Sequence, residues 1–380
     1  MRYFLIAGEA SGDMHGANLM KALRRNDASA EFVFLGGDLM KQVGGVQIKD
    51  YREMAFMGIV NVLMNMNKVL KNFRDCEQAL STHKPDVVIL IDYPSFNLRI
   101  AKWVKKHLPQ TPVYYYIAPK LWAWKSWRIK SIKKYVDKMF TIFPFETAYF
   151  AGKGYAVDYV GNPTVDAIDN YLQQATPNIP SKPTIALLAG SRKQEIKGCL
   201  KTMVAAAKMF PDYQIVVTTA PSIDEAYYRE ILGEDTDIQL SHNTYETVRT
   251  ATVAVVNSGT ATLETALLRT PQIVVYHVFG GRFASLLRKI LIKIPYVSLV
   301  NLIGEKEVAK ELIAHQFTKE NIVRELHTLL YNNAIQQQML SDYDVIAAKL
   351  GEPDTAERAS KAIINSLHQT KKRVDKTATF

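Results

Sequence analysis

Cysteine and long apolar runs are both scarce in this sequence, and each scarcity excludes a class of protein. Only Cys76 and Cys199 occur among 380 residues, far apart in the chain, which excludes a disulfide framework and a cysteine-based zinc site and favours a reducing compartment. No apolar run approaches the roughly 18–20 residues that a transmembrane helix needs. A chain that spans a membrane, or that is cross-linked by disulfides, is therefore not expected.

Two further absences concern targeting and metals. The apolar start Met1–Gly8 is interrupted by Glu9 after the length of one strand, which argues against a signal peptide and favours a cytoplasmic site of action. No Asp-X-Asp pair, which could hold a divalent cation, follows the carboxyl end of a predicted strand. We therefore expect neither a metal nor another cofactor.

The charge of +10 calls for an anionic partner. Nucleic acid is not expected, because no recognised nucleic-acid motif occurs and the aromatic residues lack the spacing of a base-stacking sheet. Basic and apolar residues mix in Met54–Arg74, Lys120–Lys134 and Arg282–Lys293, a pattern typical of anionic membrane surfaces. A core face flanked by solvated lysines explains any one stretch more simply, but the three together favour the membrane. The candidate contacts are Met57, Met64, Trp122, Trp124, Trp127, Leu286, Arg288 and Lys289.

Length and hydrophobic pattern predict two α/β domains. A chain of 380 residues exceeds one ordinary core, and alternating strand and helix signals predict parallel sheets with crossover helices. The proline-containing stretch Gln174–Pro183 is interpreted as the linker. We expect one domain over residues 1–173, a second over 184–344, helices at about 345–367 that join the first domain, and a loose basic tail over 368–380.

The expected elements follow from apolar runs bounded by turn residues. Strands are predicted at 3–7, 31–35, 87–91, 113–117, 138–142 and 157–160 in the first half, and helices at 14–25 and 57–72. In the second half strands are predicted at 184–188, 214–218, 238–240, 253–256 and 272–276, and helices from 305 to about 367. Two such domains facing each other would share a cleft at the carboxyl ends of their strands, where parallel sheets bind ligands.

In the second half, Ile185–Ile196 and Val253–Leu267 each combine a strand, a Gly and hydroxyl turn and a helix start. Such a turn offers N–H groups and a positive helix dipole to a phosphate. Glu264 lies one turn into the second helix, where its carboxylate can accept hydrogen bonds from ribose hydroxyls, and the fork of Arg192 suits a pyrophosphate. With Ser258, Gly259 and Thr260 these residues predict a pocket for a nucleoside diphosphate sugar.

Two loops of the first half are candidates for the second substrate. Glu9, Ser11, Gly12 and Asp13 follow the first strand, and either form a binding turn or simply provide an N-cap through Ser11 or Asp13. Asp92 ends the buried strand VVILI, where partial loss of water would raise its pKa towards that of a useful general base. A turn-starting Asp ahead of a proline is the plainer alternative, and the spacing only slightly favours the base.

Eight fragments together resemble the lipid-A-disaccharide synthase family, glycosyltransferases of family 19 with the GT-B fold. The fragments are AGEASGD (Ala7–Asp13), MGIVNVL (Met57–Leu63), IDYPSFN (Ile91–Asn97), YYIAPKLWAW (Tyr115–Trp124), FPFE (Phe143–Glu146), AGSRKQEI (Ala189–Ile196), SGTATLE (Ser258–Glu264) and YVSLVNLI (Tyr296–Ile303). The resemblance runs over nearly the whole length. The chain departs from common family residues at Ser95, Asn162 and Val300.

The resemblance implies an inverting transfer from UDP-2,3-diacylglucosamine to 2,3-diacylglucosamine 1-phosphate at the inner face of the cytoplasmic membrane. It implies that Asp92 is the general base, with Asp13 as the second candidate, and that Arg192 and the N–H groups before Glu264 take the place of a metal ion at the leaving UDP. Asn301 would contact the nucleotide or the donor sugar. The acyl chains of both substrates give the anionic membrane surface a purpose. Whether the protein forms a homodimer is left undecided by the resemblance.

Three rival interpretations differ in what they require. Another GT-B enzyme of UDP-sugars, such as an epimerase or a peptidoglycan-type transferase, would use a different acceptor or none. A non-catalytic protein that binds UDP-sugars at the membrane surface would tolerate the loss of Asp92. A nucleic-acid-binding protein would show binding that depends steeply on salt.

Overall fold

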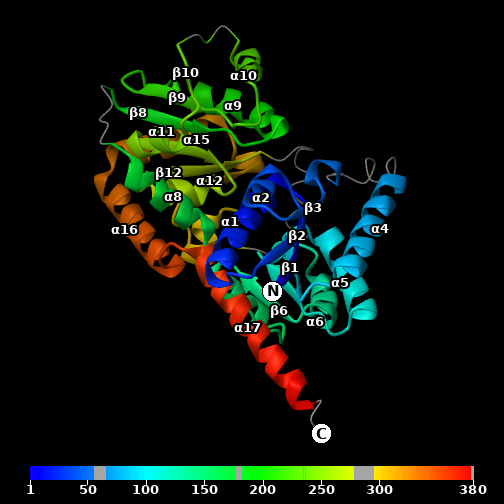
Figure 1. Cartoon of the computed structure of the whole chain (residues 1–380). Coiled ribbons are helices and arrows are strands. Elements are labelled where there is room, and N and C mark those ends of the chain that lie inside the picture. The colour runs from blue at the N-terminus through cyan, green and yellow to red at the C-terminus, as the bar shows by residue number, and fades with distance from the viewer. Residues whose placement is uncertain (55–65, 177–181, 234, 236, 278–294, 378–380) are drawn as a thin grey trace. The chain divides into compact units, whose positions relative to one another are not determined.

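The computed structural model describes residues 1–54, 66–176, 182–233, 235, 237–277 and 295–377. The chain forms two compact units, one of residues 1–163 and 353–380 and the other of residues 164–352 (Figure 1). Helix α8 (Pro163–Gln174) lies with the second unit and not, as predicted, with the first. The reason is its apolar face, since Ile168 is buried in one cluster with Ala186 and Val256 of the second sheet.

The first unit contains a seven-stranded parallel sheet of order β3-β2-β1-β4-β5-β6-β7. Its strands are β1 (Arg2–Ala7), β2 (Glu31–Leu35), β3 (Val46–Lys49), β4 (Val87–Ile91), β5 (Val113–Tyr116), β6 (Lys138–Thr141) and β7 (Asp158–Tyr159). Its helices are α1 (Ala10–Asn26), α2 (Asp38–Val43), α4 (Met66–His83), α5 (Pro94–His107), α6 (Ile129–Tyr135), α7 (Pro144–Ala151) and α17 (Thr355–Thr377), with 3₁₀ turns at η1 (Tyr51–Glu53) and η2 (Ser126–Arg128).

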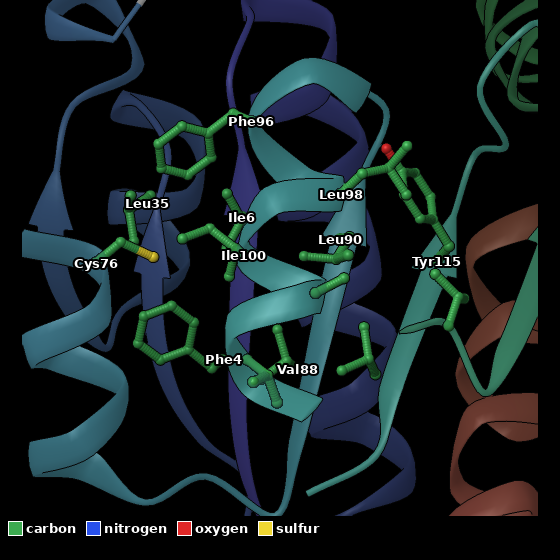
Figure 2. Packing of buried hydrophobic residues seen from close by; sticks show 14 of the residues in the cluster. Phe4, Ile6, Leu35, Cys76, Val88, Leu90, Phe96, Leu98, Ile100 and Tyr115 are labelled. Atoms are coloured by element: carbon green, nitrogen blue, oxygen red, sulfur yellow. The ribbon is translucent and has the colours of Figure 1, made fainter. Parts of the chain in front are cut away.

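Alternate residues of the central strands face the two sides of this sheet, and helices cover both sides. On one side Phe4, Ile6 and Val88 pack with Cys76 of α4 and Ile100 of α5, as Figure 2 shows. On the other side the cluster includes residues of β1, β4, α1 and α17. Both cysteines are free and buried, in agreement with the prediction that neither serves a disulfide.

The C-terminal helix α17 returns to the first unit and packs against α1 (Figure 1). Ile363 and Leu367 belong to the core cluster on that side of the sheet. The prediction of a loose tail over 368–380 is wrong for most of its length, because α17 continues to Thr377. The predicted tail is helical because Gln, Lys and Arg are good helix formers.

The second unit contains a six-stranded parallel sheet of order β10-β9-β8-β11-β12-β13. Its strands are β8 (Thr184–Leu188), β9 (Gln214–Thr218), β10 (Gln239–Ser241), β11 (Val253–Asn257), β12 (Gln272–Tyr276) and β13 (Glu311–Ile313). Its further helices are α9 (Lys193–Ala207), α10 (Glu225–Leu232), α11 (Thr244–Thr250), α12 (Ala261–Leu267), α14 (Leu299–Gly304), α15 (Lys319–Tyr331) and α16 (Asn333–Leu350), with a 3₁₀ turn at η3 (Ala314–Gln316).

Several boundaries differ from those predicted. Strands β3 and β13 are missing from the prediction because each is a short edge strand without a long apolar run. Helix α1 begins at Ala10 rather than at residue 14. The sequence Ala-Ser-Gly-Asp is typical of a turn, but here it forms the first turn of the helix. The helix expected at 57–72 lies partly outside the described residues, and α4 continues to His83.

Candidate functional site

Strand register brings the predicted loops of the first unit to one edge of its sheet. Ala7 of β1 pairs with Ile91 of β4, and Ile91 pairs with Tyr116 of β5. Gly8 and Asp92 therefore leave the sheet at the same level. Gly8 is required there because the ring of Tyr93 covers it: a Cβ at Gly8 would lie 2.2 Å from Tyr93 Cδ1.

Three residues at this edge of the sheet have unfavourable backbone conformations. Asp92 and Tyr93 adopt left-handed conformations with φ of 42° and 45°. Ile117, at the end of β5, has φ of 63°, which is a marked outlier for a β-branched residue. Left-handed residues other than glycine persist where surrounding contacts over-determine them, and they cluster at functional sites.

Asp92 is held through its backbone carbonyl. The Tyr115 hydroxyl donates to Asp92 O at 2.5 Å and Asn97 Nδ2 donates to the same oxygen at 2.7 Å. Burial raises the pKa of the Asp92 carboxyl, and the positive charge of Lys120 opposes that rise. A partly desolvated carboxylate that a neighbouring ammonium helps to keep ionised has the properties of a general base.

A second buried carboxyl lies near Lys120. Glu146, 1% exposed, accepts hydrogen bonds from Trp122 Nε1 at 3.1 Å and from the N–H of Phe143 at 3.1 Å. Burial raises its pKa to about 7 against these hydrogen bonds and the charge of Lys120. Glu146 thereby ties the loop after β5 to the start of α7.

The loop after β1 serves the fold more than was predicted. Asp13 is buried, and its carboxylate accepts from the N–H groups of Gly37, Leu39 and Met40 at 2.7–3.1 Å. The prediction of Asp13 as second candidate base is therefore not supported, because its carboxylate already caps the start of α2.

The remaining residues of that loop lie on the first turn of α1. Glu9 is its N-cap and is half-buried, Ser11 is exposed and Gly12 is buried. A Cβ at Gly12 would lie 3.3 Å from the Ala7 Cβ, so the small residue lets α1 approach the end of β1 closely. Among these residues, Glu9 and Ser11 stay accessible to a ligand.

In the second unit, a side chain of α9 accepts hydrogen bonds from the backbone N–H groups at the start of this helix. Glu195 Oε2 accepts from the N–H of Ser191 at 3.0 Å and of Arg192 at 3.3 Å. The Glu195 carboxylate therefore occupies donors that were predicted to face a phosphate. The Arg192 side chain, 72% exposed, contacts Glu195 only at 3.4 Å, so its guanidinium remains accessible at the strand-end edge.

The loop before α12 is the more open of the two. Gly259 and Thr260 are exposed, and no described residue accepts a hydrogen bond from their backbone N–H groups. A Cβ at Gly259 would meet no atom of the described residues within 4 Å. Burial raises the pKa of Glu264, one turn further on. The Ser258 hydroxyl is directed inward, to Val297 O at 2.9 Å.

The prediction that Asn301 contacts the nucleotide or the donor sugar is not supported. Its fully buried side chain donates to Ala309 O at 2.8 Å and to Glu311 Oε1 at 3.0 Å, and accepts from the N–H groups of Val308 and Ala309. These bonds use the amide completely. The helix α14 turns Asn301 inward, where it fastens the connection to β13.

The predicted membrane residues have different surroundings. Trp122 is half-buried, with its ring edge-on to Phe143 and Phe145, and so differs from the expected lipid-facing side chain. Trp124 is 57% and Trp127 64% exposed. The other predicted contacts, Met57, Met64, Leu286, Arg288 and Lys289, lie outside the described residues.

Residues at the three departures from the family pattern fit their surroundings. Ser95 accepts a hydrogen bond from Arg128 Nη2 at 2.9 Å. Asn162 is buried and donates to Ile142 O at 2.8 Å. Val300 is fully buried on α14.

Sequence reasoning missed several polar residues of these two edges, namely Asn97, Tyr115, Lys120, Glu146, Glu195 and Glu311. For Glu195 the signal was present, because a Glu three residues after the N-cap position is a capping-box pattern. Glu146, three residues after the N-cap of α7, shows the same pattern, and Asn97 bonds carbonyl groups five and six residues before it. For Tyr115, Lys120 and Glu311 only the fold brings the partners together.

Within the parts of the chain that the structure describes, no group of three or more His, Cys, Asp or Glu side chains could hold a metal ion. In the same parts, no helix combines the length and the apolar character that crossing a bilayer requires.

Solved structures of two kinds share this fold. UDP-GlcNAc 2-epimerase from Neisseria meningitidis bound to UDP-GlcNAc matches with a TM-score of 0.64 at 14% identity, over 97% of this chain and 100% of that one. The glycotransferase of kitacinnamycin matches with a TM-score of 0.62 at 11% identity, over 96% and 99%. These likenesses confirm the predicted GT-B fold.

Sequence comparison goes further than fold. The lipid-A-disaccharide synthase of Acidobacterium capsulatum is 36% identical over 374 residues, which cover 93% of this chain and 92% of the relative. That of Myxococcus xanthus is 36% identical over 377 residues, covering 96% and 97%. A profile of the lipid-A-disaccharide synthetase family matches residues 3–363. The chain belongs to this family.

Proposed function

We propose that this chain is a lipid-A-disaccharide synthase that transfers 2,3-diacylglucosamine from UDP to 2,3-diacylglucosamine 1-phosphate. The family supports a UDP-sugar donor and a lipid acceptor. The observation that carries the chemistry is Asp92, a partly desolvated carboxyl on a strained strand end beside Lys120. The inversion at the donor carbon implied by the family pattern requires one in-line displacement and one base.

In this reaction the Asp92 carboxylate takes the proton of the acceptor 6-hydroxyl as that oxygen bonds to the anomeric carbon of the donor. The bond from that carbon to the UDP oxygen breaks, and its electron pair leaves with UDP. The raised pKa of Asp92 makes its carboxylate a stronger base than an exposed aspartate. The positive charge of Lys120 opposes that rise and so favours the ionised form of Asp92.

The leaving UDP would be bound in the second unit. The accessible Arg192 guanidinium suits a diphosphate, and the backbone N–H groups of Gly259 and Thr260 donate to no described residue. Glu264 is placed one turn into α12, where a carboxylate can accept from ribose hydroxyls. We propose that these groups stabilise the departing charge without a metal ion.

We further propose that the enzyme works at the inner surface of the cytoplasmic membrane, where acylated substrates reside. Trp124 and Trp127 are exposed next to basic residues, with Lys125 Nζ 4.2 Å from the Trp124 ring centroid. Exposed tryptophans beside lysines suit the headgroup level of a bilayer.

The test is UDP release from UDP-2,3-diacylglucosamine in detergent micelles containing EDTA, with and without the acceptor. We expect release that needs the acceptor and withstands EDTA. Asp92→Asn should lower it by about 100-fold or more, because asparagine keeps the shape and tolerates the left-handed backbone but takes no proton. Asp344→Ala, at an exposed surface ion pair, is the matched control and should retain full activity.

Other outcomes would favour the rivals. Conversion of the donor without any acceptor would indicate an epimerase. Binding of UDP with no turnover in the wild type would indicate a binding protein. Full activity of Asp92→Asn would keep the synthase and reject Asp92 as its base, and loss of activity in EDTA would reject metal independence.

A further inference from the structure

The conformation of Asp92 is unfavourable on its own. Two consecutive residues other than glycine, Asp92 and Tyr93, have positive φ, a region that L-residues avoid because Cβ crowds the neighbouring carbonyl. Such a pair relaxes unless contacts from outside the turn hold it. The contacts that hold it therefore determine where the Asp92 carboxylate lies.

Tyr93 is held through its side chain. Its hydroxyl donates to Met54 O at 2.9 Å, and its ring lies over Gly8. Asp92 is held differently, through its main chain. Its carbonyl oxygen accepts from Tyr115 Oη at 2.5 Å and from Asn97 Nδ2 at 2.7 Å, and the same amide nitrogen lies 3.2 Å from Ile91 O.

Both donors are rigidly placed. Tyr115 on β5 and Asn97 on α5 are fully buried, and Figure 2 shows the Tyr115 hydroxyl pointing towards the end of the cluster where α5 begins. Burial keeps the pKa of Tyr115 well above its ordinary value, so the hydroxyl remains a donor at every working pH. Side chains of β5 and α5 therefore hydrogen-bond the carbonyl groups at the carboxyl end of β4.

We propose that Tyr115 and Asn97 are positioning residues, which hold the end of β4 in its left-handed turn and so aim the Asp92 carboxylate at the acceptor hydroxyl. The inference rests on the proposed role of Asp92 as base. Neither residue needs to touch a substrate. These hydrogen bonds keep the turn in its strained conformation in the free enzyme. The Asp92 carboxylate is therefore already in position before the acceptor binds.

Removing one donor should weaken the grip and leave the fold intact. In Tyr115→Phe one oxygen is deleted from a packed ring, and Asn97 Nδ2 still satisfies Asp92 O. The turn can then relax part of its strain, and the carboxylate moves from its reactive position. A displacement of the order of 1 Å costs about a hundredfold in rate, and it affects proton transfer rather than substrate affinity.

The experiment compares Tyr115→Phe with Tyr155→Phe in the full chain. Tyr155 packs against the same core cluster, and its hydroxyl also donates to a backbone carbonyl, Val136 O at 3.0 Å. We expect Tyr115→Phe to lower kcat about tenfold to a hundredfold with KM for both substrates nearly unchanged. Tyr155→Phe should keep the wild-type kcat. Because released strain offsets the lost hydrogen bond, Tyr115→Phe should also lower Tm less than Tyr155→Phe does.

A cycle with Asp92→Asn separates this inference from the proposed function. If Tyr115 acts through Asp92, Tyr115→Phe has no further effect on the residual rate of Asp92→Asn. An equal fold-loss in both backgrounds would overturn the inference and leave Asp92 as base. So would a wild-type kcat in folded Tyr115→Phe, or a fall in kcat equal to that of Tyr155→Phe. Full activity of Asp92→Asn would overturn both.

Discussion

Two carboxyl groups at one edge of the first sheet have raised pKa values for the same reason and serve different ends. Burial is the main cause for Asp92 and for Glu146, and the positive charge of Lys120 opposes it at both. Glu146 is enclosed by hydrogen bonds from Trp122, Ile142 and Phe143. Asp92 is gripped at its carbonyl instead. Solvation and hydrogen bonding, rather than residue type, separate the structural carboxyl of Glu146 from the carboxyl of Asp92, which is proposed to react.

Glu146 makes stability depend on pH. Its pKa rises from 4.5 to about 7 on folding, so between those values the folded state binds more protons than the unfolded state. The stabilising effect is complete below pH 4.5 and is lost as pH rises through about 7, by an amount on the order of 3 kcal/mol. We expect that part of the pH dependence to be absent in Glu146→Gln, as measured by urea unfolding across this range.

The exposed Glu31, which pairs with Arg2, provides the control. Glu31→Gln should leave the difference in unfolding free energy between acidic and neutral pH as it is in the wild type. A Glu146→Gln variant with the same pH dependence as the wild type would show that Glu146 does not titrate as expected.

At the scale of elements, β13 and α14 are joined by one buried carboxylate. Glu311 accepts from the N–H groups of Val297 and Ser298, from the Ser298 hydroxyl at 2.6 Å and from Asn301 Nδ2. Val297 O in turn accepts from Ser258, in the loop before α12. A carboxylate surrounded by donors at a helix start is well stabilised. The network holds that loop to the strand at the sheet edge.

Glu311→Gln tests this junction. An amide has one acceptor oxygen where the carboxylate has two, and its NH₂ group would face donors. We expect the free energy of unfolding to fall by about 1–3 kcal/mol, measured by urea denaturation. Glu307→Gln, at an exposed ion pair with Lys310, should change it by less than about 0.5 kcal/mol. Equal effects of the two substitutions would contradict the network.

At the scale of the whole molecule, the proposed contact with an anionic membrane surface rests on the charge of +10 and on the exposed tryptophans. The electrostatic attraction between the basic protein and an anionic surface weakens as the salt concentration rises. Aromatic rings contribute to membrane binding by inserting into the bilayer surface, which only exposed rings can do. The two contributions therefore separate in experiment.

We expect the protein to co-sediment with vesicles that contain anionic lipid, less with neutral vesicles, and less at high salt. The double variant Trp124→Ser, Trp127→Ser should bind anionic vesicles several-fold more weakly, because its apolar insertion is lost. Leu172→Ser removes an exposed apolar side chain from α8 and should bind as the wild type does. Equal binding by all three proteins would reject the tryptophan contact.

The sequence by itself determined what depends on local pattern. Apolar runs bounded by turn residues located the strands β1, β4, β8 and β11 closely, because a buried parallel strand must be continuously apolar. Since parallel sheets bind ligands at the carboxyl ends of their strands, the same pattern pointed to Asp92 and to the loop before α12. The fragments shared with the family gave the reaction class.

The tertiary structure decided what each polar side chain at those edges faces. Asp13 and Asn301 were sensible candidates by position, yet the Asp13 carboxylate accepts from backbone N–H groups at the start of α2. The Asn301 amide is used by Val308, Ala309 and Glu311. Tyr115 carried no local signal, because its partner Asp92 comes from another element. Glu146 did carry one, as a Glu three residues after the N-cap of α7, but its hydrogen bond from Trp122 follows only from the fold. Residue type and spacing set which chemistry a side chain can perform, but packing across strands sets its partners and its pKa, and hence which chemistry it performs.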